Sequence, residues 1–232
     1  MLLRSLADIE RAIRASWSRE TCDPVDCDAW SPENPSRGQC AVTALVVQDL
    51  CGGELLLAEV HYPDGSRQGL HYWNRLGEGV ELDLTREQFE PDEIVGPAEA
   101  IERPADLTSG RLYPQYQALS RAVRAGLGGE ILHLTTRAEW EAARACGRYA
   151  PPSLAAEGFI HFSDATQVAR VAAARFAGVE DVVLLCVPVD RLDAPLRYET
   201  SDAGAERFPH LYGPLAVDAV ARVVGFDDRI TR

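Results

Sequence analysis

The stretch LHYWNRLGEGVELDLT, residues 70–85, decides the fold of the first half of the chain. Two runs of alternating character, LHYWNRL and VELDLT, flank a Gly-Glu-Gly segment, and this pattern predicts a β-hairpin. If Leu76 pairs with Val80 across that loop, His71 and Asp83 become diagonal neighbours on one face of the hairpin. A carboxylate at that distance can orient an imidazole ring, so we expect His71 and Asp83 to form a hydrogen-bonded pair.

A cysteine stands at the start of the preceding helix. The segment CAVTALVVQDLCGG, residues 40–53, predicts a buried helix that begins at Cys40 and ends at two glycines. A helix N-terminus carries partial positive charge and free N–H groups, which stabilise a thiolate. With His71 as the base and Asp83 as its orienting carboxylate, Cys40 completes the pattern of a thiol triad. The Cys40 backbone N–H and one side chain would then stabilise an oxyanion. The candidates for that side chain are Gln39, Trp30 and Asn34.

The same residues also allow a structural interpretation. Buried free cysteines are common, Trp73 suits a core, and a single histidine usually satisfies its hydrogen bonds within the fold. The two interpretations differ in the reactivity that they predict for Cys40. An activated thiol reacts with iodoacetamide near neutral pH faster than Cys22, Cys27 or Cys51, and a structural one does not.

The chain order of these elements resembles a known superfamily. A Cys at a helix start, a His strand and an Asp strand follow one another in transglutaminase-like and papain-like proteins, and HYWN and DLT are similar to their His-x-Trp-x and Asp-x-Thr strands. More narrowly, residues 1–125 resemble the bacterial YunG-like family in SWSRETC, NPSRGQCAVTALVVQDLCGG, HYWNRL and DLTREQF. The resemblance implies a transglutaminase- or papain-like fold whose thiol acts on an amide or ester bond of a small-molecule or peptide substrate.

Length and charge suggest two unlike halves. A chain of 232 residues suits two domains, and the GLGG segment predicts a boundary that leaves residues 1–127 and 128–232 as the domains. Strands dispersed among helices favour an α+β fold class. The net charge is −13, and residues 1–110 hold 9 Arg against 21 Asp and Glu, which gives −12. Phosphates need cationic partners, so nucleic acid is an improbable partner of the first domain.

The composition indicates the cellular compartment of the protein and the redox state of its cysteines. The N-terminus lacks the long apolar core of a signal peptide, and no run reaches the roughly 20 apolar residues that span a bilayer. We therefore expect a cytoplasmic protein without membrane contact, in which the 6 cysteines are thiols. Neither the cysteines nor the histidines follow the spacing of metal ligands, so no metal is expected.

The second half places polar residues beside strands. The segments ILHLTT, GFIHFSD and FPHLYGPL carry three histidines, and PHLYG between two prolines suits either a rigid turn or a ligand loop. Side chains that emerge from successive strands can line one cleft. The expected lining residues are His133, His161, Ser163, His210 and Tyr212.

Residues 131–226 resemble a small bacterial domain family in ILHLTT, GRYAPPSLAAEGFIHFSD, VVLLCVPVD, LRYE and FPHLYGPL, and the strand order is similar to that of the ADP-ribosyltransferase fold. The resemblance implies NAD or an ADP-ribose-like ligand, with His133 on the ribose and Ser163 after the next strand. Such proteins carry a glutamate where this chain has His210 and Tyr212, and Glu199 is the nearest acid. That departure puts ordinary ADP-ribosyl transfer in doubt.

Two functions remain at this point. The first is a bidomain enzyme with a Cys-His-Asp thiol site and a second cleft for an NAD- or ADP-ribose-like ligand. The alternative is a non-catalytic nucleotide-binding or sensor protein that retains both folds. An intact Cys-His-Asp set favours the first function, and the displaced glutamate favours the second.

Overall fold

The computed structural model describes residues 5–104, 107–200 and 206–226. The chain divides into two compact units, one formed by Ser5–Gly126 and the other by the residues from Leu127 onward. Both units mix helices and strands, so the fold class is α+β with two domains. No helix among the described residues combines the length and the apolar character that crossing a bilayer requires.

Within residues 5–104 and 107–127, the first domain contains three helices, five strands and two short 3-10 turns. They are α1 (Leu6–Ser16), α2 (Cys40–Cys51), β1 (Glu54–His61), β2 (Arg67–Arg75), η1 (Gly77–Gly79), β3 (Glu81–Leu82), η2 (Arg86–Gln88), β4 (Ile94–Val95), β5 (Glu99–Ile101) and α3 (Tyr113–Leu127). Helix α1 begins with a capping box, in which Ser5 and Asp8 each accept from the backbone N–H of the other. Helix α2 ends at Gly52, whose positive φ suits glycine.

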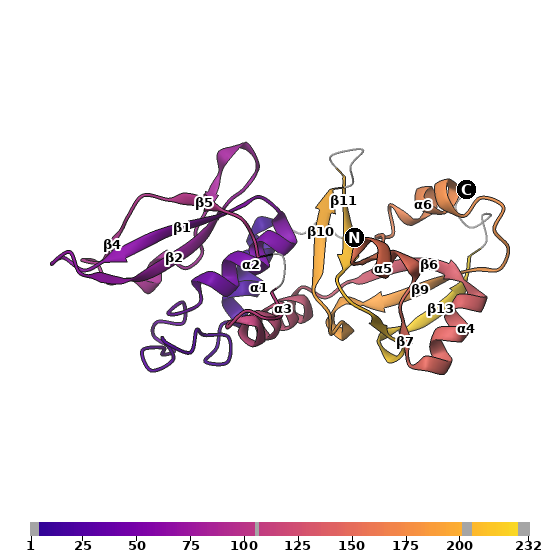
Figure 1. The fold of residues 1–232 in the computed structure, drawn as a ribbon, viewed down its shortest axis with the longest axis horizontal. Helices are drawn as coiled ribbons and strands as arrows, with labels where there is room; N and C mark the ends of the chain where they lie inside the picture. The colour runs from indigo at the N-terminus through magenta and orange to yellow at the C-terminus, as the bar shows by residue number, and fades with distance from the viewer. Residues whose placement is uncertain (1–4, 105–106, 201–205, 227–232) are drawn as a thin grey trace. The chain divides into compact units, whose positions relative to one another are not determined.

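One antiparallel sheet organises this domain, with the strand order β3-β2-β1-β4 and β5 also paired with β1 (Figure 1). The hairpin register agrees with the sequence prediction, because Leu76 N–H donates to the Val80 carbonyl and Asn74 lies opposite Leu82. Strand β3 is only two residues long, so β2 runs on without a partner on that side. The strands β4 and β5 lie in a Pro-rich connection for which the sequence predicts no regular structure.

The second domain is assembled from shorter elements. In chain order they are β6 (Glu130–Thr136), α4 (Arg137–Cys146), β7 (Arg148–Tyr149), α5 (Pro152–Glu157), β8 (Ile160–His161), α6 (Val168–Arg175), β9 (Val182–Pro188), η3 (Val189–Arg191), β10 (Leu196–Thr200), β11 (Arg207–Leu211), β12 (Leu215–Ala216), η4 (Val217–Ala219) and β13 (Arg222–Gly225). The segment DATQVARVAAARFAG, residues 164–178, predicts a helix that is longer than α6. The sequence does not predict β7, α5 or β12. FPHLYGPL, expected as a turn or ligand loop, instead contains the end of β11 and the start of β12.

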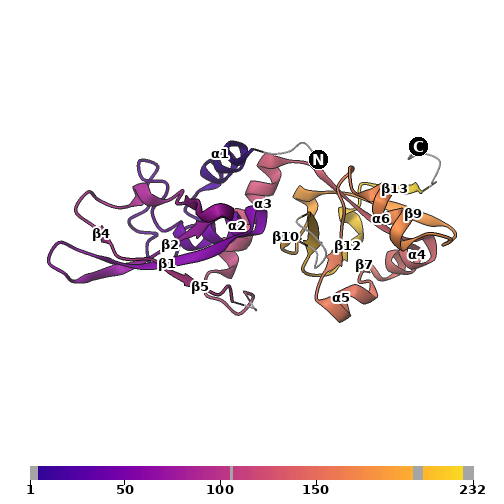
Figure 2. The same cartoon turned by 90° about the horizontal axis from the view of Figure 1, so that it is seen from above.

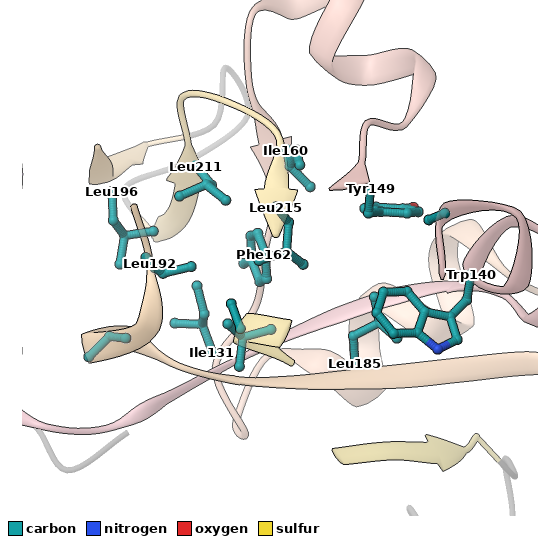
Figure 3. Close-up of a cluster of buried hydrophobic side chains, with 14 of the residues drawn as sticks. Ile131, Trp140, Tyr149, Ile160, Phe162, Leu185, Leu192, Leu196, Leu211 and Leu215 are labelled. Atoms are coloured by element: carbon teal, nitrogen blue, oxygen red, sulfur yellow. The ribbon is translucent and has the colours of Figure 1, made fainter. Parts of the chain in front are cut away.

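The described residues of this domain form three sheets: β13-β9-β6, β10-β11-β8 and β12-β7. The sheet β13-β9-β6 is covered on both faces. Helix α6 packs Val168 and Ala172 against Leu132 and Cys186 on one face, and Figure 2 shows α6 beside β9. The other face contributes Ile131 and other residues to a larger core that it shares with β10-β11-β8 (Figure 3).

The side chains of the sheet β10-β11-β8 alternate between that core and the opposite face of the sheet. Leu196, Ile160 and Leu211 point into the core, as Figure 3 shows. Side chains alternate along a strand, so the intervening residues lie on the opposite face, which we call the outer face. Its members are Arg197, Glu199, Phe159, His161, Phe208, His210 and Tyr212.

Candidate functional site

The sulfur of Cys40 lies at the unpaired edge of strand β2. Cys40 is the first residue of α2, as the sequence predicts. Its Sγ is 3.9 Å from the Leu70 carbonyl oxygen and accepts hydrogen bonds from the backbone N–H groups of Tyr72 and Ala41. Because β3 ends at Leu82, this part of the β2 edge is open to the start of the helix.

His71 and Asp83 form the expected pair. His71 Nε2 is 2.7 Å from Asp83 Oδ2, and the imidazole is fully buried, with Trp73 stacked on it at a centroid distance of 5.1 Å. The second oxygen of Asp83 accepts the Thr85 backbone N–H at 3.1 Å, which fixes the carboxylate. A carboxylate only accepts hydrogen bonds, so the proton of the neutral imidazole lies on Nε2. Nδ1 is then the basic nitrogen.

Gln88 lies between the base and the thiol. Its side-chain Nε2 is 3.2 Å from His71 Nδ1, and the same side chain lies near enough to the Cys40 sulfur to lower the pKa of the thiol slightly. Its backbone is held as well, because its carbonyl accepts Asn34 Nδ2 at 3.1 Å and its N–H donates to the Thr85 carbonyl at 3.0 Å. Hydrogen bonds therefore link Asp83, the ring and Gln88, and the Gln88 side chain borders the sulfur.

The sequence analysis does not identify Gln88. The available signal was its position in DLTREQF, where a short turn after Asp83 returns the chain toward the hairpin. The contacts of Gln88 with His71 and the Cys40 sulfur depend on how this turn packs against the hairpin, and residue spacing alone does not predict that packing.

The thiol of Cys40 is protonated in the resting site. Burial raises its pKa, and the N–H groups of Tyr72 and Ala41 oppose that effect only in part, so the pKa is about 11. The nearby negative charge of Asp26 raises it further. The sequence predicts a thiolate stabilised by the helix N-terminus, and desolvation outweighs that stabilisation here.

The residues expected as oxyanion donors are engaged elsewhere. Gln39 is buried and its Nε2 donates to the Ser18 carbonyl at 2.9 Å, and the indole N–H of Trp30 donates to the Pro35 carbonyl at 3.1 Å. Both N–H groups hold the loop that leads into α2. Gln88, whose amide already contacts the sulfur, is the side chain best placed for that role.

In the second domain, His133 belongs to an internal network. Its Nδ1 is 2.6 Å from the His161 carbonyl oxygen and its Nε2 is 2.8 Å from the Tyr149 hydroxyl, which lies 3.0 Å from Thr135 Oγ1. Burial lowers the pKa of His133 to about 4, so the ring is neutral at neutral pH. Both ring nitrogens are occupied by groups of the protein, so the side chain is not presented to a ligand.

Four of the other expected residues gather on the outer face. Glu199 Oε2 accepts from His210 Nδ1 at 3.0 Å and from the Tyr212 hydroxyl at 2.7 Å, and the rings of His161 and His210 meet edge to face at 5.1 Å. Ser163 lies apart from them, buried in an isolated bridge with Leu132. The expected cleft is therefore divided between the outer face and the interior.

Glu199 supplies the carboxylate whose placement the sequence leaves open. Burial opposes its ionisation, but the hydrogen bonds from His210 and Tyr212 and the charge of Arg197 outweigh burial, so the pKa of Glu199 is lowered. Burial and the bond to Glu199 raise the pKa of Tyr212 to about 12. Within the described residues, no group of three or more His, Cys, Asp and Glu side chains has the arrangement of a metal site.

In comparisons with known proteins, the two regions of the chain match two different families. Residues 5–128 match the family described as YunG protein, and residues 134–223 match the family described as protein of unknown function DUF952. The first region is 37% identical over 82 residues to the protein titled uncharacterized protein YunG of Bacillus subtilis, and the match covers 35% of this chain and 61% of that protein. The chain thus spans about three fifths of the length of that curated relative.

Part of the chain is also similar to protein CC0527 of Caulobacter crescentus. Its crystal structure is 42% identical, with 43% of this chain and 87% of that chain covered and a TM-score of 0.40. Its solution NMR structure is also 42% identical, with 42% and 84% covered and a TM-score of 0.39. The match to residues 5–128 covers more than half of the 232 residues, and the chain belongs to the YunG family.

Proposed function

We propose that the first domain catalyses acyl transfer or hydrolysis through a thioester on Cys40, with an amide or ester as substrate. The observation that carries the proposal is that hydrogen bonds link Asp83, His71 and Gln88, and that the Gln88 side chain borders the Cys40 sulfur. Nucleophile, base and orienting carboxylate in this order are the parts of a thiol triad. The order of their elements along the chain supports a transglutaminase- or papain-like arrangement.

The tautomer of His71 suits a base. Asp83 holds the proton on Nε2, so Nδ1 can accept the proton of the Cys40 thiol. The sulfur then attacks the carbonyl carbon, a thioester forms, and the imidazolium returns its proton to the departing amine or alcohol. Water or an amine cleaves the thioester in a second step, and the free thiol is restored.

Gln88 has to move before that proton can pass. In the resting site its amide occupies His71 Nδ1, so thiol and base do not bond to each other directly. When a substrate carbonyl enters beside the sulfur, the amide can turn toward the developing oxyanion, which joins the Cys40 backbone N–H as its partner. Deprotonation is then coupled to substrate binding, which agrees with a resting thiol whose pKa is about 11.

Turnover of ester and amide substrates tests this proposal. The full chain is incubated with p-nitrophenyl acetate and with short peptide p-nitroanilides, and nitrophenol or nitroaniline release is followed. We expect Cys40→Ala to abolish turnover and His71→Asn to lower it by about 10²–10⁴-fold, the contribution of a positioned base. Cys51→Ala is the matched control, because Cys51 is a half-buried thiol at the other end of α2. Equal rates in the wild type and Cys40→Ala would end the proposal.

A second candidate concerns the second domain. An ADP-ribosyltransferase-like domain that binds NAD or an ADP-ribose-like ligand is favoured by Glu199, because its carboxylate stands beside His210 and Tyr212, where the sequence lacked one. The ligand would lie on the outer face, since His133 is engaged internally. Thermal unfolding with NAD and ADP-ribose tests it: a ligand at 100 times its Kd stabilises the protein by about 2.7 kcal/mol. No shift with either compound would remove this candidate.

A further inference from the structure

The outer face carries a row of titratable groups across three strands. His210 on the central strand β11 pairs with Arg197 on β10 and with His161 on β8. The next position on the same face of β10 is Glu199, which bonds to His210 and Tyr212. The guanidinium of Arg197 lies over the ring of Tyr212 at 4.0 Å, and Glu157 pairs with His161 at 3.0 Å.

One imidazole in this row has a fixed proton and an unused nitrogen. His210 Nδ1 is 3.0 Å from Glu199 Oε2, and a carboxylate only accepts, so Nδ1 carries the proton. Nε2 has no hydrogen-bond partner among the described residues. It is also absent from the set of their side-chain N and O atoms that are both fully buried and unpartnered. Phe159 stacks on the ring face at 4.1 Å and so leaves the edge with Nε2 as the reactive side.

His133 provides a contrast at the same degree of burial. The two residues are 6% and 8% exposed, for His210 and His133 respectively. Both nitrogens of His133 bond to the protein, whereas only one nitrogen of His210 does. A buried histidine that serves the fold satisfies both nitrogens, so burial alone does not account for the free nitrogen of His210.

We propose that His210 is a proton-transfer centre that acts on a hydroxyl-bearing ligand or a bound water at the outer face. Nε2 accepts the hydroxyl proton, the oxygen keeps the electron pair of the O–H bond, and the imidazolium is stabilised by Glu199. The reverse step returns the proton to an oxygen. Tyr212 and Arg197 hold Glu199 in place, so these two are positioning residues.

This proposal shares its face with the nucleotide candidate, but it requires no nucleotide. The reactivity of the free protein decides it, whereas a thermal shift decides the other. A domain that binds no NAD can still carry a reactive His210, and a nucleotide-binding domain can lack one.

The five histidines allow a test in one sample. Diethyl pyrocarbonate acylates an unprotonated imidazole nitrogen that it can reach, and the rate at each histidine of the full chain is followed by peptide mass spectrometry. We expect His210 to be modified along with the more exposed His61 and His161, whereas His71 and His133 stay unmodified because both of their nitrogens are bonded. Resistance of His210 equal to that of His133 would overturn the proposal.

Two variants separate activation from access. Glu199→Gln keeps an acceptor for Nδ1–H but removes the negative charge that makes Nε2 a better nucleophile, so we expect the His210 rate to fall severalfold. Tyr212→Phe leaves the charge in place, so we expect a smaller change in the His210 rate than in Glu199→Gln. An unmodified His133 in both variants reports that the domain is still folded. An unchanged His210 rate in Glu199→Gln would contradict activation by the carboxylate.

Discussion

Replacing Asp83 by Asn is expected to move the ring proton of His71 from Nε2 to Nδ1. In the wild type Oδ1 of Asp83 accepts the Thr85 backbone N–H at 3.1 Å and lies 3.4 Å from the Thr85 hydroxyl, while Oδ2 faces His71 Nε2. In Asp83→Asn the single oxygen of the new side chain keeps the two Thr85 contacts, and its NH2 group then faces Nε2. The ring proton moves to Nδ1, and Gln88 turns its amide oxygen toward the ring.

The magnitude follows from the contacts. The opposite orientation of the introduced amide gives up two neutral contacts with Thr85, together about 1–2 kcal/mol. That difference is roughly a five- to thirtyfold preference for the ring with its proton on Nδ1. Exchange of the charged hydrogen bond for a neutral one costs the domain about 1 kcal/mol of stability. With Nδ1 protonated, His71 no longer accepts the Cys40 proton, and turnover falls although the other residues of the site remain in place.

Nitrogen-15 NMR of the histidine rings measures the tautomer directly. We expect the proton of His71 on Nε2 in the wild type and on Nδ1 in Asp83→Asn, together with loss of ester turnover. Glu59→Gln is the control, because Glu59 lies 3.5 Å from Nε2 of the surface residue His61 and is not connected to the thiol site. A variant that keeps the proton on Nε2 would refute the reasoning.

Further predictions concern the thiol, its neighbour and the response to acid. The structure reverses the fast labelling expected from the sequence, because a thiol whose pKa is about 11 rather than 9.0 is protonated until a substrate enters. Cys40 should therefore react with iodoacetamide about 100-fold more slowly at pH 8 than an ordinary thiol, and an early plateau below pH 7 would show a preformed thiolate. Gln88→Leu leaves the buried Nδ1 of His71 unpartnered, so urea unfolding followed by tryptophan fluorescence should show a loss of about 1–3 kcal/mol. The pKa of His133 is about 4 in the folded protein against 6.5 for the free side chain. Because the unfolded state therefore binds the proton first, the free energy of unfolding should fall as pH drops from about 6.5 to 4. Acid melts of His133→Gln should lack that loss. The lowered pKa of Glu199 acts only in stronger acid: its stabilisation is present above its unfolded pKa and is lost as pH falls through the folded pKa, so Glu199→Gln should flatten the acid melt below about pH 4.5.

Much of the first domain is predictable because its signals are local. Ser5 and Asp8 identify the start of α1, and the pattern of the hairpin identifies the register that brings His71 to Asp83. The strands β4 and β5 are not predictable in this way, because each is short and is formed only by pairing with β1. The role of Gln88 is not predictable either, because its contacts are set by the packing of a turn against the hairpin.

The second domain shows where residue spacing misleads. The histidines are correctly placed beside strands, yet alternation along β8 and β11 sends His161 and His210 outward while His133 turns inward. The two prolines of FPHLYGPL suggest a turn, but Pro209 lies within the central strand β11, where its carbonyl accepts the Phe162 N–H at 2.8 Å. The partner strands, which no single segment reveals, decide which face each residue occupies.

The acyl group itself gives the most direct test of the thiol site. The full chain is mixed with p-nitrophenyl acetate, quenched in acid and mapped by peptide mass spectrometry, with the exposed thiol Cys146 as internal reference. We predict one acetyl group on Cys40 that hydroxylamine removes, in the wild type but not in His71→Asn. Acetylation that favours Cys146 and leaves Cys40 unmodified, or that proceeds equally well without His71, would contradict a His71-assisted thiol nucleophile.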